Sequence, residues 1–167
     1  MRRGTAAGTV ILISLLASCR YGGPARVEMP ADSGAGEISF ELLGAGGAAV
    51  AVPVYLNGEG PFNFVVDTGA TFTCVNDTLA RRLNLPERTG RIGFGAGVAG
   101  AGRVRLVRID SLRVGATRAF DLTACTVDLS HVRAGGIHAS GLLGLNFLKS
   151  FKVTLDFKRK VLTLQRP

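Results

Sequence analysis

The residues with the clearest chemical potential are three consecutive ones, Asp67, Thr68 and Gly69, at the end of the apolar run FNFVV. An isolated ionised carboxylate is costly to bury, so Asp67 needs hydrogen-bond partners or a chemical purpose. The glycine allows a tight turn whose backbone N–H groups can reach the carboxylate oxygens. Two such carboxylates brought together share one proton, so that one acts as general base on a water and the other as general acid. This chemistry cleaves a peptide bond without a metal or a covalent intermediate.

The other reactive side chains offer weaker candidates. His131 and His138 lie in one polar segment with no acidic or cysteine partner at ligand spacing, so we predict no metal site and no cofactor. The stretch GAGVAGAG does not open a helix after a strand, so we do not expect it to bind phosphate. No serine lies in a G-x-S-x-G motif, and neither Cys74 nor Cys125 has a nearby Cys or His in the sequence.

Cys74 and Cys125 stand among apolar strand residues, in the words TCV and ACTV. In an oxidising compartment two such cysteines form a disulfide if their Cβ atoms approach closely enough, which the sequence does not show. We favour two buried free thiols, because free cysteine behaves as a small apolar residue in such surroundings.

Composition indicates one globular domain. The chain has 167 residues, of which 47% are apolar, and this length is enough for a single hydrophobic core. The formal net charge is +8, but residues such as Arg103, Arg105 and Arg108 alternate with apolar ones, as on the solvent side of a strand. No basic run with interleaved aromatic residues is present in the sequence, so we interpret the charge as a solvated surface and expect no nucleic-acid partner.

Residues 1–18 have the pattern of an export signal. MRRG supplies positive charge, and the apolar stretch after it is short for a bilayer span. The closing tetrapeptide Leu16-Ala17-Ser18-Cys19 resembles the lipobox of bacterial lipoprotein precursors, which implies that Cys19 becomes the lipidated first residue of the mature protein. The resemblance implies export from the bacterial cytoplasm and a membrane anchor in the cell envelope, facing the periplasm or the exterior. An ordinary secretory signal with an incidental Cys19 is the alternative.

The rest of the chain divides into a tether and a domain. Residues 19–36 are rich in Gly, Pro and Ala without periodicity and predict a flexible tether, and residues 37–167 predict the folded domain. Asn57-Gly58 predicts a hairpin turn, Asn76 predicts a helix cap before TLARRLNL, NFLKSF predicts a second short helix, and DLSHVRAGGIHAS predicts a loop. Alternating apolar residues predict strands at 38–42, 50–56, 62–66, 73–75, 104–114, 120–127, 152–157 and 161–164. Many short strands with few helices predict an all-β sandwich or barrel.

Two sequence motifs, far apart in the chain, together resemble those of one protein family. FVVDTGAT, followed about 75 residues later by GLLGLNFLKSFKVTLDF, is similar to the retropepsin-like aspartic proteases, over about residues 48–164. The resemblance implies a small closed β-barrel with one or two short helices. It implies Asp67 as the catalytic acid/base, Thr68 as the hydroxyl that braces two active-site loops, and Gly69 and Ala70 as support of the loop. It also implies a substrate-binding flap at Gly95, Ala96, Gly97 and Val98, and packing beside the site by Leu142, Leu143 and Gly144.

A chain of this kind supplies one catalytic aspartate, whereas the chemistry needs two. Asp32-Ser33-Gly34 matches the same pattern on paper, but Pro30 precedes it and no apolar strand leads into it. The second carboxylate is therefore expected from a second copy of the chain, so that Asp67 of each copy meets on a two-fold axis of a homodimer. Pro167 and the strand before it are candidates for that interface.

Three functional interpretations stay open. We favour a lipid-anchored, dimeric aspartic endopeptidase that hydrolyses peptides or proteins. The alternatives are a retropepsin-like lipoprotein that binds peptides or envelope components without cutting, and a structural lipoprotein in which Asp67 only caps a turn. Ala70 stands where pepsin-like enzymes often carry a serine that donates to the aspartate, so we expect activity at milder pH than pepsin's. A rate maximum below about pH 3 would contradict this.

Overall fold

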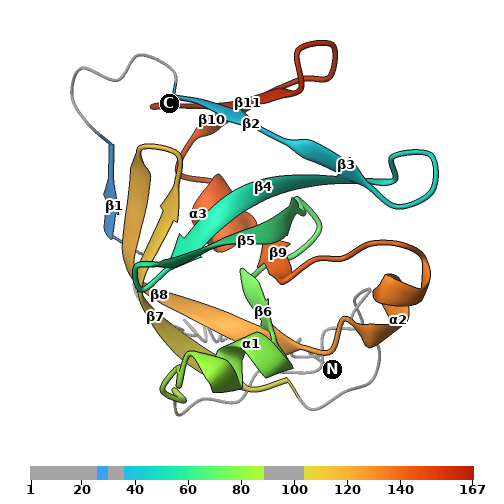
Figure 1. Ribbon diagram of the computed structural model, residues 1–167. Helices are drawn as coiled ribbons and strands as arrows, with labels where there is room; N and C mark the ends of the chain where they lie inside the picture. Colours follow the sequence, from blue (N-terminus) through green and yellow to red (C-terminus); the bar gives the residue numbers. More distant parts are fainter. Residues whose placement is uncertain (1–25, 30–35, 89–103) are drawn as a thin grey trace, which may run out of the picture.

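The structure is a computed structural model that describes residues 26–29, 36–88 and 104–167 (Figure 1). Strands dominate these ranges: β1 (Arg26–Glu28), β2 (Gly36–Ser39), β3 (Glu41–Leu43), β4 (Ala49–Leu56), β5 (Glu59–Val66), β6 (Cys74–Asn76), β7 (Leu106–Val114), β8 (Thr117–Val127), β9 (Gly141–Leu143), β10 (Lys152–Asp156) and β11 (Val161–Gln165). The helices are short: α1 (Asp77–Arg82), α2 (Ser130–Ala134) and α3 (Leu145–Leu148). None of the helices in the described part of the chain has the length and apolar composition needed to cross a bilayer.

Six strands close into a barrel, which confirms the closed β-barrel that the family resemblance implied. The ring runs β4–β5–β9–β6–β8–β7 and returns to β4, since β7 pairs with both β8 and β4. Each strand in the ring pairs with the next. The pairs β5–β9 and β6–β8 are parallel, and the others are antiparallel. Because the barrel is closed, the backbone N–H and C=O groups that would be unpaired at the edges of an open sheet have partners. The ring therefore holds β5, β6 and β9 in fixed register, and these are the strands next to Asp67.

A three-stranded sheet, β10–β11–β2, lies beyond one side of the barrel and is seen at the top of Figure 1. It contains the predicted C-terminal hairpin, and β11 is its central strand, paired with β10 on one side and β2 on the other. Both backbone edges of β11 are thus occupied within a single chain.

Local signals placed the turns and the first helix correctly. Asn57 and Gly58 both have positive φ, 50° and 89°, which is the geometry of the tight hairpin between β4 and β5. Asn76 caps α1, because its side-chain oxygen accepts a hydrogen bond of 3.0 Å from the Thr78 N–H.

Two segments form structure where we expected none. Residues Arg26–Glu28, within the expected tether, form β1 and pair antiparallel with β8 at Arg118 to Phe120. The loop interpretation of the segment DLSHVRAGGIHAS was wrong in part, since Ser130–Ala134 form α2. The backbone N–H of Ser130 donates to the Asp128 carboxylate at 2.9 Å, and this hydrogen bond stabilises the first turn of the helix.

The apolar side chains form two clusters on opposite faces of the sheet. The larger one fills the barrel and includes the fully buried Phe64, Leu143 and Phe147. The second lies between the outer face of β5, β9, β6 and β8 and the α2 segment, and it includes Leu129 and Ala139. Residues of the second cluster, from the strands and from the α2 segment, line a cavity next to Asp67.

Our preference for free thiols was wrong. Cys74 and Cys125 are joined by a disulfide that links β6 to β8, with 4.4 Å between the two Cα atoms. The two residues are direct partners in the parallel β6–β8 register, which brings the sulfur atoms together. Both are more than nine-tenths buried in the second cluster.

Candidate active site

Asp67 lies immediately after β5, at the start of a loop of residues 67–73, the Asp67 loop. One of its carboxylate oxygens accepts a hydrogen bond of 2.9 Å from the Gly69 N–H, and its carbonyl accepts one of 3.3 Å from the Ala70 N–H. Asp67 is half-buried, whereas Thr68 and Gly69 are exposed. The backbone of the turn thus orients the carboxylate, while the tip of the loop is exposed on the surface of the chain.

The Asp67 loop is held by the first residues of the second family motif, Leu143 to Leu145. The Asp67 N–H donates to the Leu143 carbonyl at 3.1 Å, and the Leu145 N–H donates to the Ala70 carbonyl at 2.8 Å. The Gly144 N–H donates to the Thr73 hydroxyl at 3.2 Å. These bonds join positions more than 70 residues apart in the sequence. They fix the direction in which Asp67 projects.

Two glycines permit this close approach. A side chain at Gly144 would place its Cβ 2.4 Å from backbone atoms of Phe72, and one at Gly141 would lie 2.4 Å from the Cys74 carbonyl and the Phe64 ring. Real Cβ contacts are not so short, so any larger residue would force β9 away from the Asp67 loop. The predicted packing role of Gly144 has a direct steric reason.

The two leucines between these glycines face opposite sides of the sheet. Leu143 is fully buried in the barrel core, whereas Leu142 belongs to the second cluster. Leu142 pairs with Val65 on one side and with Cys74 on the other. A row of side chains therefore crosses the sheet from β5 to β8, and it ends at the disulfide.

Sequence reasoning missed Asn146, which braces the Asp67 loop from behind. Its side-chain oxygen accepts a hydrogen bond of 2.7 Å from the Thr73 N–H, and its amide nitrogen donates to the Thr123 carbonyl at 2.7 Å. One amide side chain on α3 thus connects the Asp67 loop to β8. Its only signal in the sequence is a polar residue at the centre of the apolar word GLLGLNFL.

An apolar cavity of about 120 Å³ opens beside Asp67. Its other lining residues are all apolar: Ala49, Val65, Leu129, Val132, Ile137, Ala139 and Leu142. No second carboxylate lines this cavity, so within the described part of the chain Asp67 supplies its only acid.

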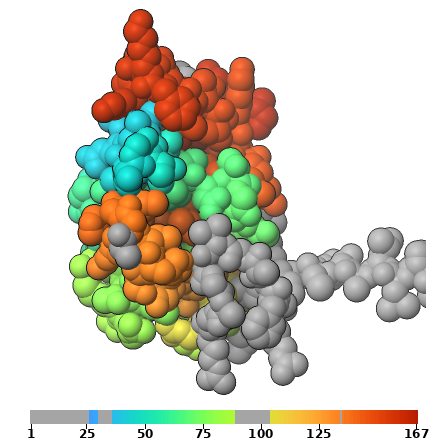
Figure 2. Space-filling view, turned by 90° about the vertical axis from the view of Figure 1, so that its right-hand side faces the viewer, coloured from blue at the N-terminus to red at the C-terminus, as the bar shows by residue number. Residues whose placement is uncertain are grey.

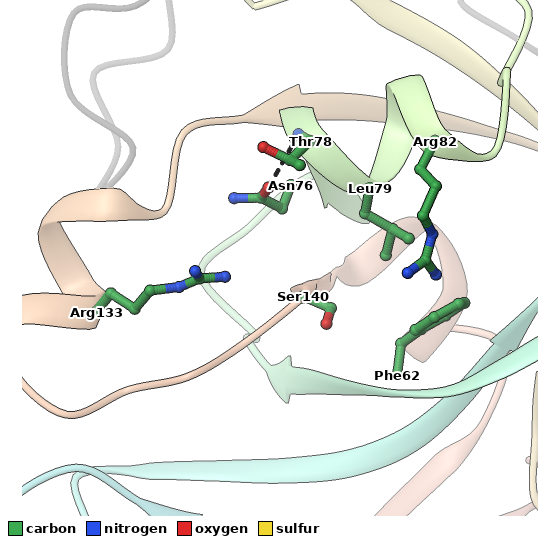
Figure 3. Close-up of a pocket in the computed structure, with 7 residues that line it drawn as sticks. All are labelled: Phe62, Asn76, Thr78, Leu79, Arg82, Arg133 and Ser140. Atoms are coloured by element: carbon green, nitrogen blue, oxygen red, sulfur yellow. Dashed lines mark hydrogen bonds between the residues drawn. The ribbon is translucent and has the colours of Figure 1, made fainter.

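A second depression, of about 180 Å³, lies away from Asp67 (Figure 3). Arg82 and Arg133 reach into it from opposite sides, and the Arg82 guanidinium lies 5.2 Å from the centre of the Phe62 ring. Phe62 lies in the middle of β5, five residues before Asp67, and Ser140 immediately precedes β9. This positively charged depression is thus a different surface from the apolar cavity.

Several predicted residues lie outside the described ranges. These are Cys19, the Asp32-Ser33-Gly34 word, and the expected flap residues Gly95, Ala96, Gly97 and Val98. Thr68 is described and exposed, and its hydroxyl makes no hydrogen bond with the described part of one chain. Among residues 26–29, 36–88 and 104–167 no group of three potential metal ligands comes together.

The chain has the single-domain retropepsin fold. This fold is a closed barrel of six strands in which the Asp67 loop is hydrogen-bonded to the Gly-Leu-Leu-Gly segment. A family model described as aspartyl protease matches residues 52–147, more than half of the chain. The chain therefore belongs to the aspartyl protease family.

One solved structure supports this fold. A retropepsin-like aspartic protease from Rickettsia conorii matches 84% of this chain and 93% of its own, with 20% identity and a TM-score of 0.54. At this identity the likeness concerns the fold alone. The retroviral protease-like domain of Ddi1 from Leishmania major matches 71% of this chain and 94% of its own, with 19% identity and a TM-score of 0.44. No curated protein gives a significant sequence match.

Proposed function

We propose that this protein is an aspartic endopeptidase in which two copies of Asp67, one from each chain of a homodimer, activate a water between them. The observation that carries the proposal is the fixed Asp67 loop. Its carboxylate is oriented by Gly69, and its backbone is fastened to Leu143 on β9. Family membership supports the same chemistry.

The mechanism follows from the chemistry of a carboxylate pair. Two carboxyl groups close together hold a single proton between them, because both cannot ionise comfortably at short range. The ionised Asp67 removes a proton from the water as it attacks the peptide carbonyl carbon, and the protonated Asp67 of the other copy donates to the carbonyl oxygen. The first Asp67 then gives the proton that it took from the water to the departing amine as the C–N bond breaks, and one hydroxyl of the tetrahedral intermediate returns its proton to the second Asp67. The carboxylate pair is restored, and no metal or covalent acyl intermediate is required.

A dimer supplies what one chain lacks. Thr68 and Gly69 at the tip of the Asp67 loop are exposed, and Leu145 beside them is 38% exposed although it is apolar. A two-fold axis near these residues would bring the two loops together and cover them. Because β11 has both edges paired within one chain, Pro167 and β11 would contribute side chains to an interface rather than a new strand pairing.

The anchor is part of the proposal. Lipidation at Cys19 would hold the domain at the cell envelope, with residues between the anchor and β1 as the spacer. Metabolic labelling with a fatty-acid analogue tests this step: label should enter the wild-type chain and be absent from the Cys19→Ala variant. Equal labelling of both would contradict the anchor.

The direct test of the activity is the Asp67→Asn variant of the full chain, assayed on a mixed peptide library with product detection by mass spectrometry. We expect the variant to keep the fold and to lose cleavage, and wild-type cleavage to be inhibited by a pepstatin-type inhibitor. Asp110→Asn, which removes an exposed carboxylate from β7, is the matched control and should cleave normally. Cleavage retained by Asp67→Asn would exclude this mechanism. A wild-type chain that binds peptides but never cuts them would favour the binding-module alternative.

A further inference from the structure

The apolar cavity beside Asp67 is built from two parts with different origins. Its floor comes from the strands, through Ala49, Val65 and Leu142. Its roof comes from residues 129–139, the segment that contains α2. The roof contributes Leu129, Val132, Ile137 and Ala139 to the lining. The floor belongs to the barrel, whereas the roof is an addition between β8 and β9.

The position of the cavity relates it to the bond that Asp67 would cleave. Val65, near the end of β5, and Asp67, just after it, both line the cavity. A peptide whose carbonyl lies at Asp67 would therefore place a neighbouring side chain over Val65, at the mouth of the cavity. Apart from Asp67, the residues that line the cavity offer that side chain only apolar contact.

Hydrogen bonds and packing hold the roof in place. The Ile137 N–H donates to the Val132 carbonyl at 3.2 Å, which closes the turn after α2. Leu129 and Ala139, at the two ends of the roof, are 3% and 2% exposed. The Ile137 side chain also packs against Gly44 in the β3–β4 loop, where an added Cβ would lie 2.9 Å from it. Figure 2 shows α2 (orange) next to that loop (cyan) on the same side of the molecule.

The cavity volume sets a limit on what can enter. An engineered apolar cavity of about 150 Å³ is known to hold a benzene ring. The cavity at Asp67 is smaller, at about 120 Å³, and its roof is fastened at both ends. An aliphatic side chain of the size of Val, Leu or Ile is therefore better matched to it than a Phe, Tyr or Trp ring.

We propose that residues 129–139 act as a size filter, which admits a branched aliphatic side chain next to the scissile bond and rejects an aromatic one. The proposal rests on the endopeptidase function proposed above and assigns its substrate class. Val132 and Ile137 are the specificity-determining residues, because they are the roof residues that line the cavity between its buried ends, Leu129 and Ala139. In a symmetric dimer two such cavities would flank the bond, so the preference would apply on both of its sides.

The experiment compares the full-length wild-type chain with Ile137→Ala and Val132→Ala on two peptides that differ only in Leu or Phe beside the cleaved bond. A pocket change of this size alters discrimination by about 10-fold or more. We expect kcat/KM of the wild type to favour the Leu peptide, and the Leu/Phe ratio to fall by about tenfold in Ile137→Ala. His138→Ala, an exposed neighbour that does not line the cavity, should keep the wild-type ratio.

Failure of the filter and failure of the activity are distinguishable. If the folded Ile137→Ala and Val132→Ala variants cleave with an unchanged Leu/Phe ratio, the filter is refuted while the endopeptidase function stands. If the wild type cleaves neither peptide, the proposed activity fails instead. Fluorescence anisotropy of the two labelled peptides with Asp67→Asn then decides the filter alone: tighter binding of the Leu peptide, reduced by Ile137→Ala, supports it, and equal binding of both peptides overturns it.

Discussion

Removal of the Asn146 side chain should loosen the Asp67 loop and lower both stability and activity. Asn146→Ala deletes the acceptor of the Thr73 N–H and the donor to the Thr123 carbonyl, each at 2.7 Å. Thr73 is fully buried, so its N–H would lose its partner without gaining water. A buried donor left unpaired costs about 1–3 kcal/mol, and loss of an ordinary hydrogen bond costs about 0.5–1.5 kcal/mol. The free energy of unfolding should therefore fall by about 1.5–4.5 kcal/mol.

Urea denaturation, monitored by circular dichroism, measures this change in the free energy of unfolding. Peptide cleavage is assayed separately, without urea. Lys149→Ala, an exposed change at the end of the same helix, is the control and should alter stability by less than about 0.5 kcal/mol. Cleavage by Asn146→Ala should fall even where the variant is fully folded, because the Asp67 loop is no longer tied to β8. A stability loss below about 0.5 kcal/mol, together with full cleavage, would refute the bracing role.

Three further predictions concern other supports of the site. Replacing Cys74 and Cys125 by alanine removes the disulfide that closes a loop of 51 residues, so the free energy of unfolding should fall by about 4 kcal/mol. A fall of less than about 1 kcal/mol would contradict this prediction. Gly144→Ala should lower the free energy of unfolding by about 2 kcal/mol or more and abolish most peptide cleavage. Gly36→Ala is the control and should leave both unchanged, because Gly36 has open space around it. Equal effects of the two variants in urea denaturation would refute the steric argument. The hydrogen bond from the backbone at the start of α2 holds the pKa of Asp128 below its ordinary value of 3.8. The carboxylate therefore stabilises the fold above that pH and stops doing so as the pH falls well below it. Asp128→Ala should lower Tm near neutral pH but not in strong acid, and a pH-independent difference would contradict this.

The parts of the fold that were predicted correctly are those set by neighbouring residues. Asn57-Gly58 adopts its hairpin turn because both positions need positive φ, and Asn76 caps α1 through a bond to a residue two positions on. The alternation of apolar residues indicated most strands, since one face of each packs on the barrel. Residues 67–69 formed the expected turn for the same local reason.

The parts that were missed depend on residues far apart in the chain. The disulfide follows from the β6–β8 register, and no local pattern reveals which strands lie side by side. Asn146 acts on Thr73, 73 positions away. α2 has five residues and no capping side chain at Leu129, so it lacks the periodic pattern that predicts longer helices.

The statement that each chain supplies half of an active site is tested most directly by mixing. Wild-type and Asp67→Asn chains carrying different tags are co-expressed in equal amounts, and the cleavage rate is measured per wild-type chain. If two Asp67 carboxylates are required, random pairing leaves about a quarter of the dimers fully wild-type, so that rate should fall to about half of its unmixed value. An unchanged rate per wild-type chain would show that one chain is sufficient and would contradict the shared site.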